Sequence, residues 1–122
     1  MQNQAFEIIF YDKPDGTRPA KAFILSLPPK MRAKTFRLVD MLETNGPDLR
    51  EPYSKHLSDG IFELRAQVGT DLSRVFYFFM VGKKAVLTHG MTKKTQKTPP
   101  AEIERAKQYK AEYVSREENQ HE

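Results

Sequence analysis

A run of apolar side chains at residues 72–81 constrains the fold of this chain more than any other feature of its sequence. The run contains the unbroken segment Val-Phe-Tyr-Phe-Phe-Met-Val at residues 75–81. It is far shorter than the roughly 18 apolar residues that cross a membrane, and a strand with one face in water would alternate apolar and polar side chains. It therefore predicts the central strand of a sheet that is covered on both faces.

Three further segments show the patterns of strands that lie beside this central one. Residues 62–68 alternate between apolar and polar side chains, and residues 84–92 follow the tight Gly-Lys connection at residues 82–83. Residues 6–11 predict a shorter first strand. Consecutive strands that are joined by short links pair in an antiparallel meander, so the sheet is expected to be mainly antiparallel.

Three segments show the periodicity of helices. The first follows Pro19, and the pair Pro28-Pro29 separates it from a second helix that reaches about residue 43. The third opens at Pro99-Pro100, and a frayed tail is expected at residues 116–122. The predicted fold is a single α+β domain over residues 1–122 in the order β-α-α-β-β-β-α, with the helical hairpin and the C-terminal helix packed on the sheet.

Charge and composition narrow the possible functions. The chain has 20 Lys and Arg against 16 Asp and Glu, and the net charge of +4 favours polyanionic partners. No carboxylate occurs between residues 72 and 101, where six Lys and Arg lie. The chain has no Cys and its three His form no zinc motif, so neither a metal nor another cofactor is expected. With no signal peptide or membrane-spanning run, the protein is expected to be cytoplasmic.

Three ordered motifs carry a family resemblance. They are Leu-Ser-Asp-Gly-Ile-Phe-Glu-Leu-Arg at residues 57–65, Ser-Arg-Val-Phe-Tyr-Phe at residues 73–78, and His-Gly-Met-Thr-Lys-Lys-Thr-Gln-Lys-Thr-Pro at residues 89–99. A G-x-x-E-L-R strand, an R-V-x-Y strand and a K-K-T-Q-K-T-P turn recur in this order in the phage-related HigB-like branch of the RelE/ParE toxins. Over residues 52–115 the chain resembles that branch, and its fold is expected to be RelE-like.

The resemblance implies the toxin of a type II toxin-antitoxin system, an mRNA interferase that cleaves messenger RNA on the ribosome. The implied reaction is metal-independent attack of a ribose 2′-OH on the neighbouring phosphate, which needs a base, an acid and cations. The implied partners are mRNA with ribosomal RNA around it, and an antitoxin with a helix-turn-helix that is encoded next to the toxin. Two alternatives stay open: a ParE-like inhibitor of DNA gyrase, and a prophage protein that only binds nucleic acid.

The resemblance and the residue chemistry together make Arg65 the first catalytic candidate. Arg65 projects from the polar face of its strand, where a planar guanidinium can hold a scissile phosphate through two parallel hydrogen bonds. A surface ion pair with Glu63 or Glu7 is the alternative. Arg74 opens the central strand, and we expect it either to bind phosphate on the same face or to pair with Asp71.

A cluster of lysines precedes the last helix. Lys93 and Lys94 are catalytic candidates, and Lys97 is a candidate for binding RNA phosphate beside the N-terminus of that helix. A lysine can act as a general base when neighbouring cations at a desolvated site lower its pKa. At least one of these lysines is expected to reach a phosphate shared with Arg65, although a solvated basic turn is the alternative.

Three other basic side chains are candidates for the same site. Lys55 and His56 precede the Leu-Ser-Asp-Gly turn, where relatives of the RelE type carry functional basic residues. Lys55 is a candidate RNA ligand, and His56 is a candidate proton-transfer group. The alternative is that both are solvated loop residues. His89 is either an RNA ligand or a core imidazole on the side of Leu87 and Met91. RelE-type toxins have a functional Tyr where this chain has Thr-Pro-Pro at residues 98–100, so the general base stays open.

Overall fold

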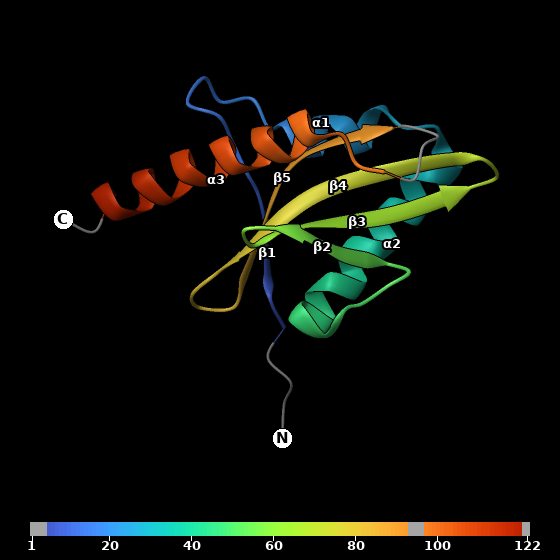
Figure 1. The fold of residues 1–122 in the computed structure, drawn as a ribbon, viewed down its shortest axis with the longest axis horizontal. Coiled ribbons are helices and arrows are strands. Elements are labelled where there is room, and N and C mark those ends of the chain that lie inside the picture. The colour runs from blue at the N-terminus through green and yellow to red at the C-terminus, as the bar shows by residue number, and fades with distance from the viewer. Residues whose placement is uncertain (1–4, 93–96, 121–122) are drawn as a thin grey trace.

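The apolar run forms strand β4 in the middle of the sheet, as the sequence predicts. In the computed structural model, which describes residues 5–92 and 97–120, the strand order is β1-β5-β4-β3-β2. The strands are β1 (Glu7–Phe10), β2 (Ser54–Ser58), β3 (Ile61–Val68), β4 (Asp71–Met80) and β5 (Lys84–Thr92). Only the β1–β5 pair is parallel among them, so the expected α+β fold with a mainly antiparallel sheet is confirmed (Figure 1).

Strand β2 is the element that the predicted order lacks, because the sequence analysis assigned Lys55 and His56 to a loop. β2 pairs antiparallel with β3 along the edge of the sheet. Its polar sequence, Ser-Lys-His-Leu-Ser, shows no apolar alternation. The connecting residues Asp59 and Gly60 have φ values of 50° and 80°, which suit a two-residue hairpin turn. The Asp-Gly dipeptide was therefore the signal in the sequence that could have revealed this hairpin.

The helices cover opposite faces of the sheet (Figure 1). In the described residues they are α1 (Pro19–Ser26), α2 (Pro29–Asn45), the short 3-10 helix η1 (Gly46–Asp48) and α3 (Pro100–Gln120). The hairpin of α1 and α2 packs on the face that carries Val75 and Tyr77, whereas α3 packs on the face that carries Phe76 and Phe78. Successive side chains of β4 enter different cores, which explains why nearly every position of this strand is apolar.

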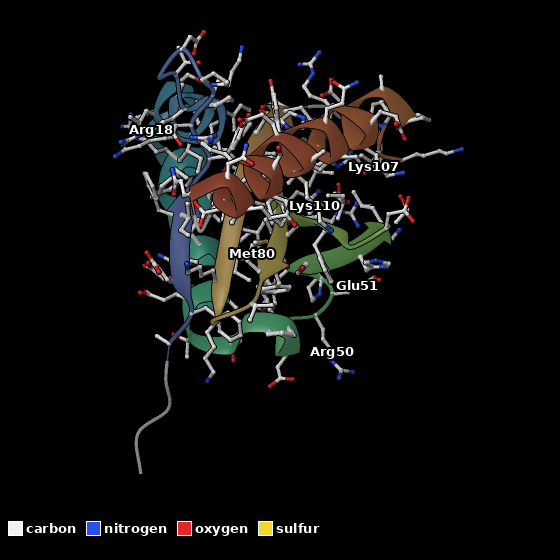
Figure 2. All side chains as sticks on the ribbon, turned by 90° about the vertical axis from the view of Figure 1, so that its left-hand side faces the viewer. Arg18, Arg50, Glu51, Met80, Lys107 and Lys110 are labelled. Atoms are coloured by element: carbon white, nitrogen blue, oxygen red, sulfur yellow. The ribbon has the colours of Figure 1, made fainter. Side chains whose placement is uncertain are left out.

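Helix α3 continues past Ser115, where the sequence analysis expected fraying to begin. Arg116 accounts for part of this extension, because its guanidinium lies 2.7 Å from a carboxylate oxygen of Glu112 and 3.2 Å from one of Asp12. On the sheet side of α3, Lys107 and Lys110 face the β2–β3 turn (Figure 2). No helix within the described ranges is both long and apolar enough to cross a membrane.

Candidate functional site

The strand register gathers four charged side chains on the α3 face of the sheet. Arg65 of β3 is paired in register with Arg74 of β4, and Lys55 of β2 is paired with Glu63 of β3. Side chains two residues apart on a strand share a face, so Glu63 and Arg65 point to the same side as Arg74 and Lys55. This is the face that the sequence predicted for Arg65 and, in one of two readings, for Arg74.

Glu63 is the centre of this group although it was not a candidate site residue. Its side chain is buried, and its carboxylate lies 3.5 Å from Nε of Arg65 and 3.6 Å from Nε of Arg74. The hydroxyl of Thr98 donates a 2.7 Å hydrogen bond to the same carboxylate. A carboxylate removed from water needs such partners. We call Glu63, Arg65, Arg74 and Thr98 the Glu63 cluster.

The side chain of Arg74 is fully buried, with 0% of it exposed. Burial lowers the pKa of the Arg74 guanidinium, and the charge of Glu63 opposes that change. Nη1 of Arg74 donates a 3.3 Å hydrogen bond to the carbonyl of Lys97. Arg74 therefore pairs with Glu63 instead of Asp71, and it orients the connection to α3 while its guanidinium is closed to a phosphate at the surface.

Arg65 lies at the rim of the cluster, with 16% of its side chain exposed. Its ion pair with Glu63 is the alternative that the sequence analysis named. A guanidinium can contact a carboxylate and a phosphate at the same time, because it carries several N–H groups. Arg65 therefore lies beside a buried carboxylate while part of its side chain is exposed, which suits the binding of a phosphate.

The segment that follows the lysine-rich loop lies against the Glu63 cluster. Lys97 is exposed and is joined to Arg74 through its carbonyl, and the next residue, Thr98, is joined to Glu63. Lys97 is therefore on the expected side of the sheet. Lys93 and Lys94 lie outside the described residues, so their candidacy rests on the sequence. The helix that follows carries Glu102 in its first turn, which already places a negative charge near its dipole.

His89 is a buried imidazole, which is one of the two settings expected for it, the alternative being an RNA ligand. Its ring is 4% exposed and stacks on Phe76, and Nε2 lies 3.0 Å from a carboxylate oxygen of Glu102. Burial lowers the pKa of His89 below its ordinary value, although Glu102 acts in the opposite direction. An imidazole enclosed in this way does not present itself to an RNA phosphate.

His89 does not lie on the face of the sheet where it was expected. The expected face was the side of Leu87 and Met91, yet His89 is paired with Phe76, whereas Leu87 is paired with Tyr77, whose side chain points to the other face. One extra residue on β5 creates a β-bulge, which shifts the alternation of side chains. His89 and Met91 consequently face α3, while Leu87 faces the helical hairpin.

Lys55 and His56 are exposed neighbours on β2, but they point to opposite faces. Lys55 shares the face of the Glu63 cluster, as its pairing with Glu63 requires. The ring of His56 packs edge-on against Phe62, 4.9 Å between centroids, on the face of the helical hairpin. The sheet therefore separates His56 from Arg65, although both were candidates for the same site.

Sequence reasoning proposed no site role for three residues that contact the candidate side chains, namely Glu63, Thr98 and Glu102. The segment from residue 72 to residue 101 has no carboxylate of its own, yet Glu63 and Glu102 approach it from β3 and α3. Such contacts depend on tertiary structure and leave no local pattern. Across residues 5–92 and 97–120, no group of three or more His, Cys, Asp or Glu side chains is arranged to hold a metal ion.

The family described as "Phage derived protein Gp49-like (DUF891)" matches residues 22–111, which include the Glu63 cluster and all three sequence motifs. The chain belongs to this family. The Gp49-like family is a RelE-like toxin family, as the motifs imply, whereas the narrower HigB-like branch stays a prediction. No curated protein matches the chain.

In this Gp49-like protein, we expect the replacement Glu63→Ala to lower the free energy of unfolding by about 3–5 kcal/mol, because it leaves the buried charge of Arg74 without its carboxylate. Urea unfolding followed by circular dichroism measures the loss. The double variant Glu63→Leu with Arg74→Met removes both charges and is expected to recover much of the stability. A single variant as stable as the unsubstituted chain would show that Glu63 is not the centre of the cluster.

We also expect a pH dependence that arises from His89. Its pKa is lowered in the folded protein from the ordinary value of 6.5, so the unfolded chain binds the proton more readily. Stability is then highest above about pH 6.5 and falls as the pH drops below that value. Unfolding free energies at about pH 7.5 and about pH 5.5 should differ more for the unsubstituted chain than for His89→Gln. Equal differences in the two proteins would contradict this assignment.

Proposed function

We propose that the protein is the toxin of a toxin-antitoxin pair and that it cleaves messenger RNA on the ribosome, in the cytoplasm. Membership of a RelE-like toxin family supports the toxin role. The observation that carries the ribonuclease role is the position of Arg65. Its guanidinium lies beside a buried carboxylate, its side chain is partly exposed, and it lies on the same sheet face as Lys55 and the segment of Lys97.

The proposed reaction is attack of a ribose 2′-oxygen on the adjacent phosphorus. A bond forms between the 2′-oxygen and phosphorus, and the bond from phosphorus to the 5′-oxygen breaks. A base takes the proton of the 2′-OH, and an acid returns one to the departing 5′-oxygen, so the products are a 2′,3′-cyclic phosphate and a 5′-OH. Arg65 stabilises the charge that develops on the phosphorane oxygens. This is electrostatic catalysis, which requires a preorganised cation.

The remaining roles are assigned from position and residue type. Lys55 and Lys97 are exposed and are proposed to hold the flanking phosphates. Lys93 and Lys94 are proposed as the proton-transfer group or as further phosphate ligands, on the strength of the sequence motif. His56 is left out of the proposed catalytic set, because it lies across the sheet from Arg65. Arg74 and Glu63 are proposed to position Arg65 and the α3 connection.

Replacement of Arg65 tests the reaction. We expect Arg65→Ala to reduce cleavage of a translated message by about 10² to 10³-fold, since a lost contact of this kind commonly costs roughly 2.7–4 kcal/mol in the transition state. Primer extension on the translated message measures cleavage. Lys83→Ala, at the β4–β5 turn, is the control and should cut normally. Thermal unfolding of both variants checks that the fold is kept.

The products and the metal dependence separate the rival functions in the same experiment. Cleavage should persist in EDTA and should leave a 2′,3′-cyclic phosphate. Cleavage that survives in the Arg65→Ala variant would remove Arg65 from the site. Inhibition of gyrase supercoiling by the protein, with no message cut, would favour the ParE-like alternative, and nucleic-acid binding without either effect would favour an accessory role.

The toxin role predicts a protein partner, because an unregulated ribonuclease of this kind would arrest its own host. We expect expression of the chain alone to stop growth and co-expression of an adjacent helix-turn-helix protein to restore it. Growth curves and co-purification of the two proteins test both points. Arg65→Ala is the control and should permit growth while still binding the partner. Normal growth with the unsubstituted chain and no co-purified neighbour would overturn the toxin role.

A further inference from the structure

A groove lies between α2 and the outer edge of β3, and Arg65 is the residue that it shares with the Glu63 cluster. Its wider part has a volume of about 500 Å³ and is lined by residues that include Lys34, Arg37, Tyr53 and Arg65. A second hollow of about 480 Å³ continues from it toward Lys30 and shares Lys34 and Arg37 with it. The two hollows form one continuous surface along the helix, which we call the α2–β3 groove.

The charge of the α2–β3 groove is of one sign. Lys30, Lys34 and Arg37 are exposed on α2 at positions i, i+4 and i+7, which brings them onto one side of the helix over about 10 Å. Arg65 adds a fourth cation at the wider end. Among the described residues that line either hollow, none is acidic. A groove of this kind attracts a chain of negative charges.

An aromatic ring and apolar side chains complete the lining of the wider part. Tyr53 lines it and is 44% exposed, which is high for a large aromatic side chain. Leu38, Met41 and Leu72 also line it. Grooves that bind single-stranded nucleic acid combine cations that follow the backbone with aromatic rings on which bases stack. Tyr53 and the α2 cations provide these two features side by side.

The edge of β3 is poorly suited to the other class of occupant, an acidic peptide that adds a strand to the sheet. The N–H of Arg65 already donates to the carbonyl of Tyr53 at 2.9 Å, and Nζ of Lys34 donates to the carbonyl of Gln67 at 2.5 Å. Added strands need such edge groups for their main-chain hydrogen bonds. A lysine placed over a strand edge also discourages edge-to-edge pairing.

We propose that the α2–β3 groove binds a single-stranded segment of RNA, with its phosphates on Lys30, Lys34 and Arg37 and a base against Tyr53. The inference rests on the proposed function for the kind of nucleic acid, and it adds a second contact surface to that function. Arg65 borders both the groove and the Glu63 cluster. An RNA strand held along α2 therefore reaches the proposed cleavage position around the edge of β3.

The test measures binding separately from cleavage. The full chain is titrated into a fluorescent 2′-O-methyl oligonucleotide of roughly 12 residues, a length within the range that one such groove covers; this probe cannot be cut, because its 2′-oxygen is blocked. Fluorescence anisotropy gives the affinity at several salt concentrations. The triple variant Lys30→Ala/Lys34→Ala/Arg37→Ala should reduce the slope of log affinity against log salt by about 2, roughly 0.7 for each lost phosphate contact.

A matched control removes the same number and kind of charges elsewhere. Lys13, Arg18 and Lys21 lie in and after the β1–α1 connection, and α1 packs against β5, away from β3 (Figure 2). The triple variant Lys13→Ala/Arg18→Ala/Lys21→Ala should keep the slope. Tyr53→Ala should weaken binding about 10-fold, and Tyr53→Phe should restore it, as stacking requires.

The possible outcomes separate three proposals: an RNA site in the groove, a protein-binding site in the groove, and the ribonuclease activity. An unchanged slope in the α2 triple variant, or equal losses in both triple variants, would overturn the groove as an RNA site. Binding of an acidic peptide probe, oligo-glutamate, that depends on the same cations while the RNA probe does not bind would assign the groove to a protein partner instead. Groove-dependent binding of the probe together with uncut message would sink the proposed ribonuclease and leave the groove standing.

Discussion

A carboxylate buried in the middle of the sheet determines how the rest of this face is built. Glu63 is 1% exposed, and a charge in such a position is stable only with close partners of opposite charge and with hydrogen-bond donors. Arg65, Arg74 and Thr98 supply them from β3, β4 and the connection to α3. The two carboxylate oxygens of Glu63 therefore bring the Arg65 side chain and Thr98, at the start of the connection to α3, to one buried group.

The sheet also divides the basic residues into two groups with different surroundings. Arg65 and Lys55 lie on the α3 face, whereas His56 and the cations of α2 lie on the side of the helical hairpin. Side chains on opposite faces of a continuous sheet meet only around its edge. β3 is near such an edge, because β2 is paired with it along only part of its length. This geometry is why Arg65 can border two surfaces.

Most of the fold could be predicted from the sequence, because its strands and helices carry local patterns. The apolar run gave β4, and helical periodicity with the proline pair gave α1 and α2. The bulge of β5, where Thr88 is the extra residue, leaves no local signal, because it changes the face of His89 without changing its neighbours in sequence. Strand β2 is a polar edge strand without apolar alternation, and its signal was the Asp-Gly dipeptide of its turn. Arg65 could be selected by type and spacing, but its anchoring by Glu63 and Thr98 depends on contacts between distant segments.

The register of the β2–β3 hairpin decides which basic residue of β2 joins Arg65. A shift of one residue would reverse every side chain of β2, so that His56 would take the place of Lys55 beside Glu63. The turn that sets this register is tied to α3, since Nζ of Lys107 lies 2.8 Å from a carboxylate oxygen of Asp59. Hydrogen bonding to Lys107 lowers the pKa of Asp59, so this carboxylate keeps its charge to lower pH than an ordinary Asp. Helix α3 thus covers one core of the sheet and also contacts the turn of the hairpin whose register puts a lysine, and not a histidine, on the face of the candidate site.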